Sequence, residues 1–204
     1  MYTRLTPAVS VLAATALSAT GIMMGVGPAA AATHLDRTIT FDCSLYGQHV
    51  PVSVHATGDL PDSVPVNQPV GTITLTATVQ IPGAAVTVAR QAGAATARAV
   101  VETGTSAVIG THEVNGGPDH LVGSPAPLPT AGPVTLTATD TGAGPSMDTT
   151  GTAVVHLFDT VIVTIVAQNA DSTQNDGASD QTQCQLTPPD TDTTLATLPI
   201  TPRT

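Results

Sequence analysis

Apolar and polar residues alternate along much of the chain, and the clearest example is the segment 73–81. Its odd-numbered positions carry Ile, Leu, Ala and Val, whereas its even-numbered positions carry threonine and one glutamine. The segments 39–45, 50–56 and 134–138 follow the same alternation. A period of two is typical of a β-strand with one buried and one wet face. These four segments are therefore predicted to be strands.

The remaining segments complete the pattern of an all-β chain. The dense apolar run 153–167 predicts two short strands or one long, largely buried strand, and further strands are expected near 97–102 and 107–114. Turn signals stand at Asn115-Gly116-Gly117-Pro118 and Gly142-Ala143-Gly144-Pro145, and three prolines make 58–71 a loop or edge segment. The Ala-rich segment 84–92, which is followed by Gly93, predicts one short helix.

The N-terminal segment has the order of a secretory signal peptide. Arg4 precedes an uncharged apolar run over 8–26, which is followed by Gly27-Pro28 and four alanines. Small residues of this kind suit signal peptidase, so we expect residues 1–32 to be removed and the mature protein to begin at Thr33. An uncleaved membrane anchor is the alternative, but the run lacks the basic flank that stops transfer. We therefore expect a secreted, extracellular protein with no membrane segment after cleavage.

Composition then limits size and partners. Residues 33–187 suit one domain, and the Pro/Thr-rich tail 188–204 is predicted to be disordered. The mature chain has four arginines, no lysine and fifteen acidic residues, which gives a formal charge of −11. This charge repels phosphate backbones, so a nucleic-acid partner is excluded. The aromatic residues of the mature chain are too few for a sugar-stacking platform or an aromatic-lined pocket: Phe41, Tyr46 and Phe158.

The two cysteines, Cys43 and Cys184, lie near opposite ends of the expected domain. In an exported protein an even pair is most simply a disulfide, and two free thiols are the alternative. Neither cysteine has a second cysteine or a histidine at metal-binding spacing, which disfavours a redox or zinc role. A bond between the first strand and the end of the domain, with turns between strands, predicts an Ig-like antiparallel β-sandwich with one short helix.

Several soft motifs resemble a known family. They are Phe41-x-Cys43, a proline-punctuated region over 50–70, the helix-like segment 84–93, Leu128-Pro129-x-x-Gly132 and the final cysteine. In this order they resemble a secreted actinobacterial β-sandwich domain of unknown function, over about residues 36–187. The resemblance implies export, a disulfide and an Ig-like sandwich, and it supplies no catalytic residue.

Candidate chemistry is sparse. Calcium prefers hard oxygen ligands, and one loop supplies four of them, although it does not follow the EF-hand pattern: Asp171, Asn175, Asp176 and Asp180. The only local cluster of possible zinc ligands is His112, Glu113 and His120, and neighbouring strand residues point to opposite faces. No Gly-x-Ser-x-Gly motif is present. We therefore predict no cofactor, no catalytic residue and no metal site. A solvated acidic loop is the expected role of the four loop residues, and weak calcium binding is the alternative.

Taken with the composition, these features predict an exported, non-enzymatic β-sandwich protein. It is expected to act as a binding or structural module toward an unknown extracellular or cell-envelope component. The alternative is a secreted hydrolase whose Ser, His and Asp residues come together only in the folded protein.

Overall fold

A computed structural model describes residues 33–203, so the predicted signal peptide lies outside the described residues. The described chain is almost entirely β-structure, with one α-helix and one short 3-10 helix. The elements are β1 (Thr33–Leu45), β2 (Gln48–Leu60), β3 (Val64–Pro65), β4 (Thr72–Ile81), α1 (Gly83–Gln91), β5 (Thr96–Glu102), β6 (Thr105–Ile109), β7 (His112–Gly116), β8 (His120–Gly123), β9 (Ala126–Pro127), β10 (Val134–Ala143), β11 (Gly151–Leu157), β12 (Thr160–Gln168), η1 (Asp176–Ala178), β13 (Asp180–Leu186) and β14 (Thr194–Thr201).

Eight of these strands form a closed barrel. Their order is β12-β13-β1-β2-β4-β10-β8-β5, and pairing of β5 with β12 closes the ring. The predicted Ig-like sandwich is therefore wrong, although the all-β class is right. The alternation shows that one face of each strand is buried, and this holds equally for a sandwich and for a barrel. Closure depends on the long-range pairing of β5 with β12, which local periodicity does not encode.

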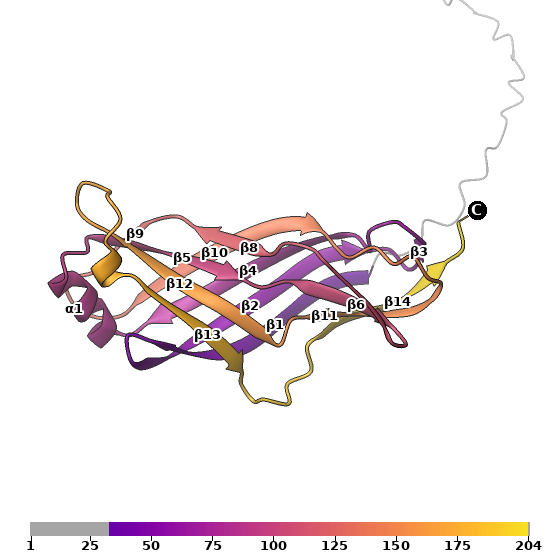
Figure 1. Cartoon of the computed structure of the whole chain (residues 1–204), viewed down its shortest axis with the longest axis horizontal. Helices are drawn as coiled ribbons and strands as arrows, with labels where there is room; N and C mark the ends of the chain where they lie inside the picture. Colours follow the sequence, from indigo (N-terminus) through magenta and orange to yellow (C-terminus); the bar gives the residue numbers. More distant parts are fainter. Residues whose placement is uncertain (1–32, 204) are drawn as a thin grey trace, which may run out of the picture.

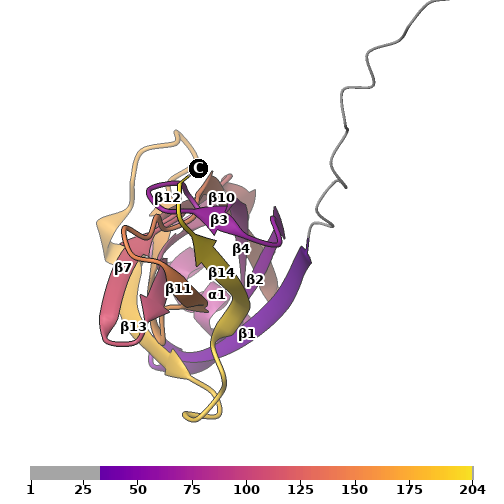
Figure 2. The same ribbon diagram turned by 90° about the vertical axis from the view of Figure 1, so that its right-hand side faces the viewer.

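A second sheet extends the barrel at one end. Its order is β3-β14-β11-β6-β7. Two of its strands are joined to barrel strands by links of two residues. The barrel strand β5 leads into β6, and β11 leads into the barrel strand β12. The molecule is long as a result, with α1 at one end and β3 and β14 at the other (Figure 1). Figure 2 looks at the latter end, with β14 and β11 in front of the barrel.

Two predictions about these strands have different outcomes. The dense apolar run 153–167 divides into two strands, β11 and β12, which is one of the two predicted forms. The Pro/Thr-rich tail, in contrast, is not disordered where the structure describes it, because β14 pairs with β11 over six register positions. Leu195, Leu198 and Ile200 on β14 bury their side chains in the core. These three spaced apolar residues lie among threonines and prolines, whose abundance favoured disorder.

The predicted alternation sets the core. On β4 the residues Ile73, Leu75, Ala77 and Val79 are fully buried, whereas the threonines between them face outward. Phe41 on β1 is also fully buried. Inward-facing side chains from all eight strands fill the barrel, so it encloses a packed apolar core.

Helix α1 lies at the end of the barrel away from the second sheet (Figure 1). Pro82 precedes its first residue, and the helix buries Ala85, Val86 and Ala89. It ends where predicted: Gly93 has a φ of +97°, which favours glycine, and its N–H donates to the carbonyl oxygen of Arg90. Across residues 33–203 we find no helix whose length and apolar character would let it cross a membrane.

The barrel is tied on one side by a disulfide between neighbouring strands. Cys43 on β1 bonds to Cys184 on β13, which confirms the predicted pair. The bond is buried and joins adjacent strands of one sheet. It does not bridge two sheets, which the sandwich interpretation would allow. Only two register pairs connect these strands, Phe41 with Leu186 and Asp42 with Gln185. The covalent bond therefore reinforces one of the two shortest ladders of the ring.

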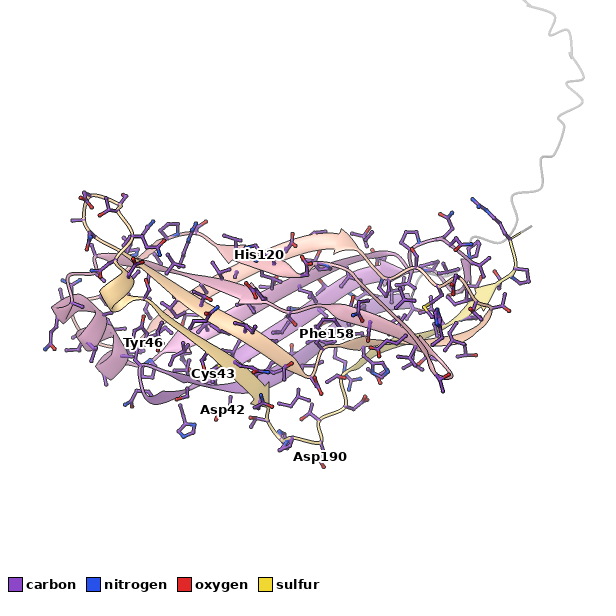
Figure 3. The ribbon with its side chains drawn as sticks, viewed as in Figure 1. Asp42, Cys43, Tyr46, His120, Phe158 and Asp190 are labelled. Carbon is purple, nitrogen blue, oxygen red and sulfur yellow. A yellow bond between two sulfur atoms is a disulfide. The ribbon has the colours of Figure 1, made fainter. Side chains whose placement is uncertain are left out.

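Tyr46 strengthens the same side. It forms the two-residue turn between β1 and β2 with Gly47, and both residues have positive φ, as this type of hairpin turn requires. Its backbone N–H donates to the Asp180 carboxylate, and its hydroxyl donates to the carbonyl oxygen of Ala178 at 2.8 Å. Burial, with a contribution from the Asp180 charge, raises the pKa of the Tyr46 hydroxyl to about 12. Cys43 and Tyr46 both lie along this side of the molecule in Figure 3.

Candidate binding surface around Phe158

Phe158 lies where the barrel meets the second sheet. It belongs to the two-residue link between β11 and β12, and its backbone N–H donates to the carbonyl oxygen of Gly104, in the link between β5 and β6, at 3.0 Å. A Cβ atom on Gly104 would stand 2.8 Å from the Phe158 ring, so glycine at this position lets the ring pack against the backbone. The ring is half-buried, and Figure 3 labels its position in the central part of the molecule.

Three shallow depressions surround this ring, and Phe158 lines each of them. Their volumes are about 240, 330 and 250 Å³. The first includes Glu102, Thr103 and Ile162, the second includes Asp119, and the third includes Ser106, Glu113, His156 and Asp159. Sites for drug-sized ligands and cofactors have volumes of about 300–1,000 Å³ and enclose most of the ligand. Two of the three volumes fall below this range and the third is at its lower end, and all three depressions are open to solvent. They therefore suit individual side chains of a larger partner better than a cofactor.

The depressions are acidic. Four carboxylates line them, from Glu102, Glu113, Asp119 and Asp159, and no arginine or lysine does so within residues 33–203. The aromatic face of Phe158 also carries partial negative charge. Both features favour a positively charged group next to the ring.

Apolar side chains continue the surface onto the barrel. Val100 on β5 is the register partner of Val122 on β8, and Ile162 on β12 is the register partner of Glu102. Val122 is one of two large apolar side chains of the described residues that are strongly exposed, at 42%. The outer face of β4 and β10 is different, because threonines face one another there, for example Thr74 and Thr141. The surface around Phe158 is hence the more apolar side of the barrel.

Thr103 adds a polar group at this surface. It lines the depression that contains Glu102 and Phe158, yet its side chain is buried. Its hydroxyl oxygen has no hydrogen-bond partner among the described residues. An unpaired buried hydroxyl costs about 1–3 kcal/mol. A donor that reached this oxygen from the depression would satisfy it.

A larger depression lies elsewhere. It has a volume of about 520 Å³ and is lined mainly by prolines and polar residues near β3, together with Arg203. Among residues 33–203, no acidic, histidine or aromatic side chain lines it. The surface around Phe158 combines charge, aromatic and unpaired polar groups, so it is the stronger candidate for function.

The predicted calcium ligands are used within the protein. Asp171 accepts from the backbone and hydroxyl of Thr173, and Asp176 accepts from Gln174. Asn175 accepts from the backbone of Ala178, and Asp180 accepts from Tyr46. In the part of the chain that the structure describes, no three His, Cys, Asp or Glu side chains are grouped to hold a metal ion. The structure gives no support to this loop as a calcium site.

The histidines are dispersed in the same way. His112 lies 3.0 Å from Asp148, whereas His120 belongs to β8 in the other sheet, so the local cluster noted in the sequence does not converge. Ser106 and His156 are register partners, and this is the nearest approach to the predicted hydrolase arrangement. His156 lies 3.4 Å from the Thr194 hydroxyl, and no carboxylate of residues 33–203 is within 4.0 Å of its ring nitrogens. The orienting acid of a catalytic triad is therefore missing there.

Sequence reasoning did not single out Phe158 as a site residue. The signal that could have found it is a lone aromatic followed by Asp159 between two apolar strands. Glu102 and Asp119 carry no comparable signal, because only the pairing of β5 with β8 and β12 brings them close to the ring.

Fold and surface together define an all-β barrel protein with an acidic candidate binding face. The chain belongs to a family of unknown function (DUF6801), whose model matches residues 40–196. Of the resemblance noted in the sequence, the membership of a family of unknown function is confirmed, whereas its β-sandwich fold is not. Neither a curated protein nor a solved structure matches the chain.

Proposed function

We propose that this protein is an exported, non-enzymatic binding module. It engages an extracellular or cell-envelope component through the surface around Phe158. The observation that carries the proposal is the convergence of three acid-lined depressions on one half-buried aromatic ring. Aromatic residues with an apolar surround are enriched where proteins bind one another.

Two features support the proposed export. The N-terminal segment has the composition of a signal peptide, and the buried disulfide between Cys43 and Cys184 suits an oxidising compartment. Fractionation of the producing cells, with mass analysis of the recovered protein, tests this part. We expect oxidised protein that begins at Thr33 outside the cytoplasm. A full-length, reduced protein in the cytoplasm would contradict it.

The hydrolase alternative has less support. Ser106 and His156 face the same depression, but His156 lacks a carboxylate partner in residues 33–203. Without that partner the imidazole is not held in the tautomer that a general base needs. Binding requires no such alignment, and this is why we favour it.

Photo-crosslinking in the producing cell tests the binding surface directly. The full chain carries p-benzoylphenylalanine in place of Phe158, and a matched control carries it in place of Thr76 on the outer face of β4. We expect a specific adduct from position 158 and none from position 76, with competition by unlabelled protein. Equal adducts from both positions, or none from position 158, would place binding elsewhere.

A further inference from the structure

We propose that the occupant of the Phe158 surface is an extended, basic polypeptide segment whose arginine or lysine side chains enter the three depressions. This inference rests on the proposed function and specifies the chemistry of its partner. It follows from the charge, the ring and the dimensions of the surface.

The charge of the surface indicates that the partner is positively charged. Glu102, Asp119 and Asp159 make no side-chain hydrogen bond or ion pair within residues 33–203, so their carboxylates are free to face an incoming group. The whole chain carries a formal charge of −10, which draws cations toward it and raises their association rate. Anionic partners are repelled by the same field.

The Phe158 ring gives a contact that selects cations. An ammonium or guanidinium group over an aromatic face is stabilised by about 0.5–1 kcal/mol at exposed sites and by more when water is excluded. A carboxylate beside the ring can hold the same group by charge-assisted hydrogen bonds. The unpaired hydroxyl oxygen of Thr103 is a further acceptor for such a donor.

Dimensions favour a polypeptide over a small cation. The three depressions open separately around one ring, and the apolar pair Val100 and Val122 continues the surface beyond them. A small amine would occupy one depression and leave the others unused. A chain in extended conformation presents side chains at regular intervals, so it can fill several depressions and cover the valines.

A second copy of this chain is a poor candidate for the occupant. The chain has five basic residues in total and no lysine. Arg37 is bound to Asp192, and Arg90 donates to the carbonyl oxygen of Leu128. The five arginines stand at positions 4, 37, 90, 98 and 203, so no segment of the chain gathers several basic residues to match the four carboxylates. We therefore assign the surface to a different polypeptide.

The test measures binding of a defined probe to the full chain. The probe is the peptide Ac-Gly-Arg-Val-Arg-Val-Arg-Gly-NH2, and its matched control replaces each arginine by neutral citrulline. Two protein variants with equal charge change are compared. One is Glu102→Gln/Asp119→Asn/Asp159→Asn at the surface, and the other is Asp36→Asn/Asp42→Asn/Asp59→Asn on the outer face of β1 and β2.

We expect the arginine peptide to shift the backbone NMR signals around Phe158 and the citrulline peptide to have no effect. Neutralising Glu102, Asp119 and Asp159 should weaken binding by at least about tenfold, whereas the β1–β2 variant should weaken it by less than about threefold. Equal weakening in both variants, or shifts centred on β1 and β2, would overturn the inference, because general charge attraction would then explain binding.

The crosslinking partner separates this inference from the proposed function. If that partner still crosslinks to position 158 after the three surface carboxylates are neutralised, the binding function stands and the basic-segment inference fails. If crosslinking is lost with the carboxylates but retained in the β1–β2 variant, both are supported.

Discussion

Two sides of the barrel are closed in different ways. Strands β1 and β13 meet through two register pairs, and this side adds the disulfide and the hydrogen bonds of Tyr46. Strands β5 and β12 meet through seven register pairs and have no covalent link. The disulfide and the Tyr46 hydrogen bonds therefore stabilise the junction of β1 with β13, whereas the surface proposed for binding surrounds Phe158 at the start of β12.

Removal of the disulfide should have the largest effect. The bond joins two cysteines that are 141 residues apart in the sequence. In the chain-entropy model, Cys43→Ala/Cys184→Ala should lower the free energy of unfolding by about 4–5 kcal/mol, as urea denaturation measures. The control replaces one cross-strand pair between β5 and β12. In Val100→Ala/Thr164→Ala the free energy of unfolding should fall by less than about 1 kcal/mol. Similar losses from both pairs would remove the contrast between the two sides.

Truncation of Phe158 should act mainly on binding. Phe158→Ala is expected to lower the affinity for the crosslinked partner by about thirtyfold, or roughly 2 kcal/mol, as truncation of an aromatic hot-spot residue does. The conservative variant Phe158→Leu keeps an apolar side chain over Gly104 and should lose only the cation contact, about two- to fivefold. Calorimetric binding and urea denaturation on each variant separate the two effects. Unchanged affinity in Phe158→Ala would remove the ring from the binding surface.

Loss of the Tyr46 hydroxyl should weaken the disulfide side. Tyr46→Phe removes the hydrogen bond to Ala178 and should cost about 1 kcal/mol. The pKa of Tyr46 is raised to about 12, above its usual value near 10. The stability linked to this hydroxyl is therefore fully present below pH 10 and is lost as the pH rises through about 12. Alkaline unfolding followed by circular dichroism should show this extra loss in the natural protein and not in Tyr46→Phe.

Substitutions on the threonine-covered face of β4 and β10 should have the smallest effect on stability and binding. Thr74 and Thr141 share a hydrogen bond of 2.9 Å between their hydroxyl oxygens, in contact with water. Replacement of both partners by valine keeps the shape and leaves neither group unpaired, so stability should change by less than about 0.5 kcal/mol. Partner affinity should not change. A tenfold loss of affinity would show that this face also takes part in binding.

Much of the local structure was predictable. The alternation over 73–81 placed β4 and identified which of its residues are buried, because the two-residue period of a strand is a property of the backbone itself. The alanine-rich segment and Gly93 placed α1 and its end in the same way. For β14 the prediction failed, because threonine and proline dominate the tail while three spaced apolar residues supply the burial.

The sequence by itself therefore determined most of the strands and their buried faces, the helix and the cysteine pair, since each depends on neighbouring residues or on residue chemistry alone. Only the tertiary structure decided that the sheet closes into a barrel, because pairing of β5 with β12 joins residues far apart in the chain. That closure, with the second sheet, also gathers Glu102, Asp119 and Asp159 around Phe158. A surface built from separate strands has no local signature, because the energy that assembles it comes from the core beneath.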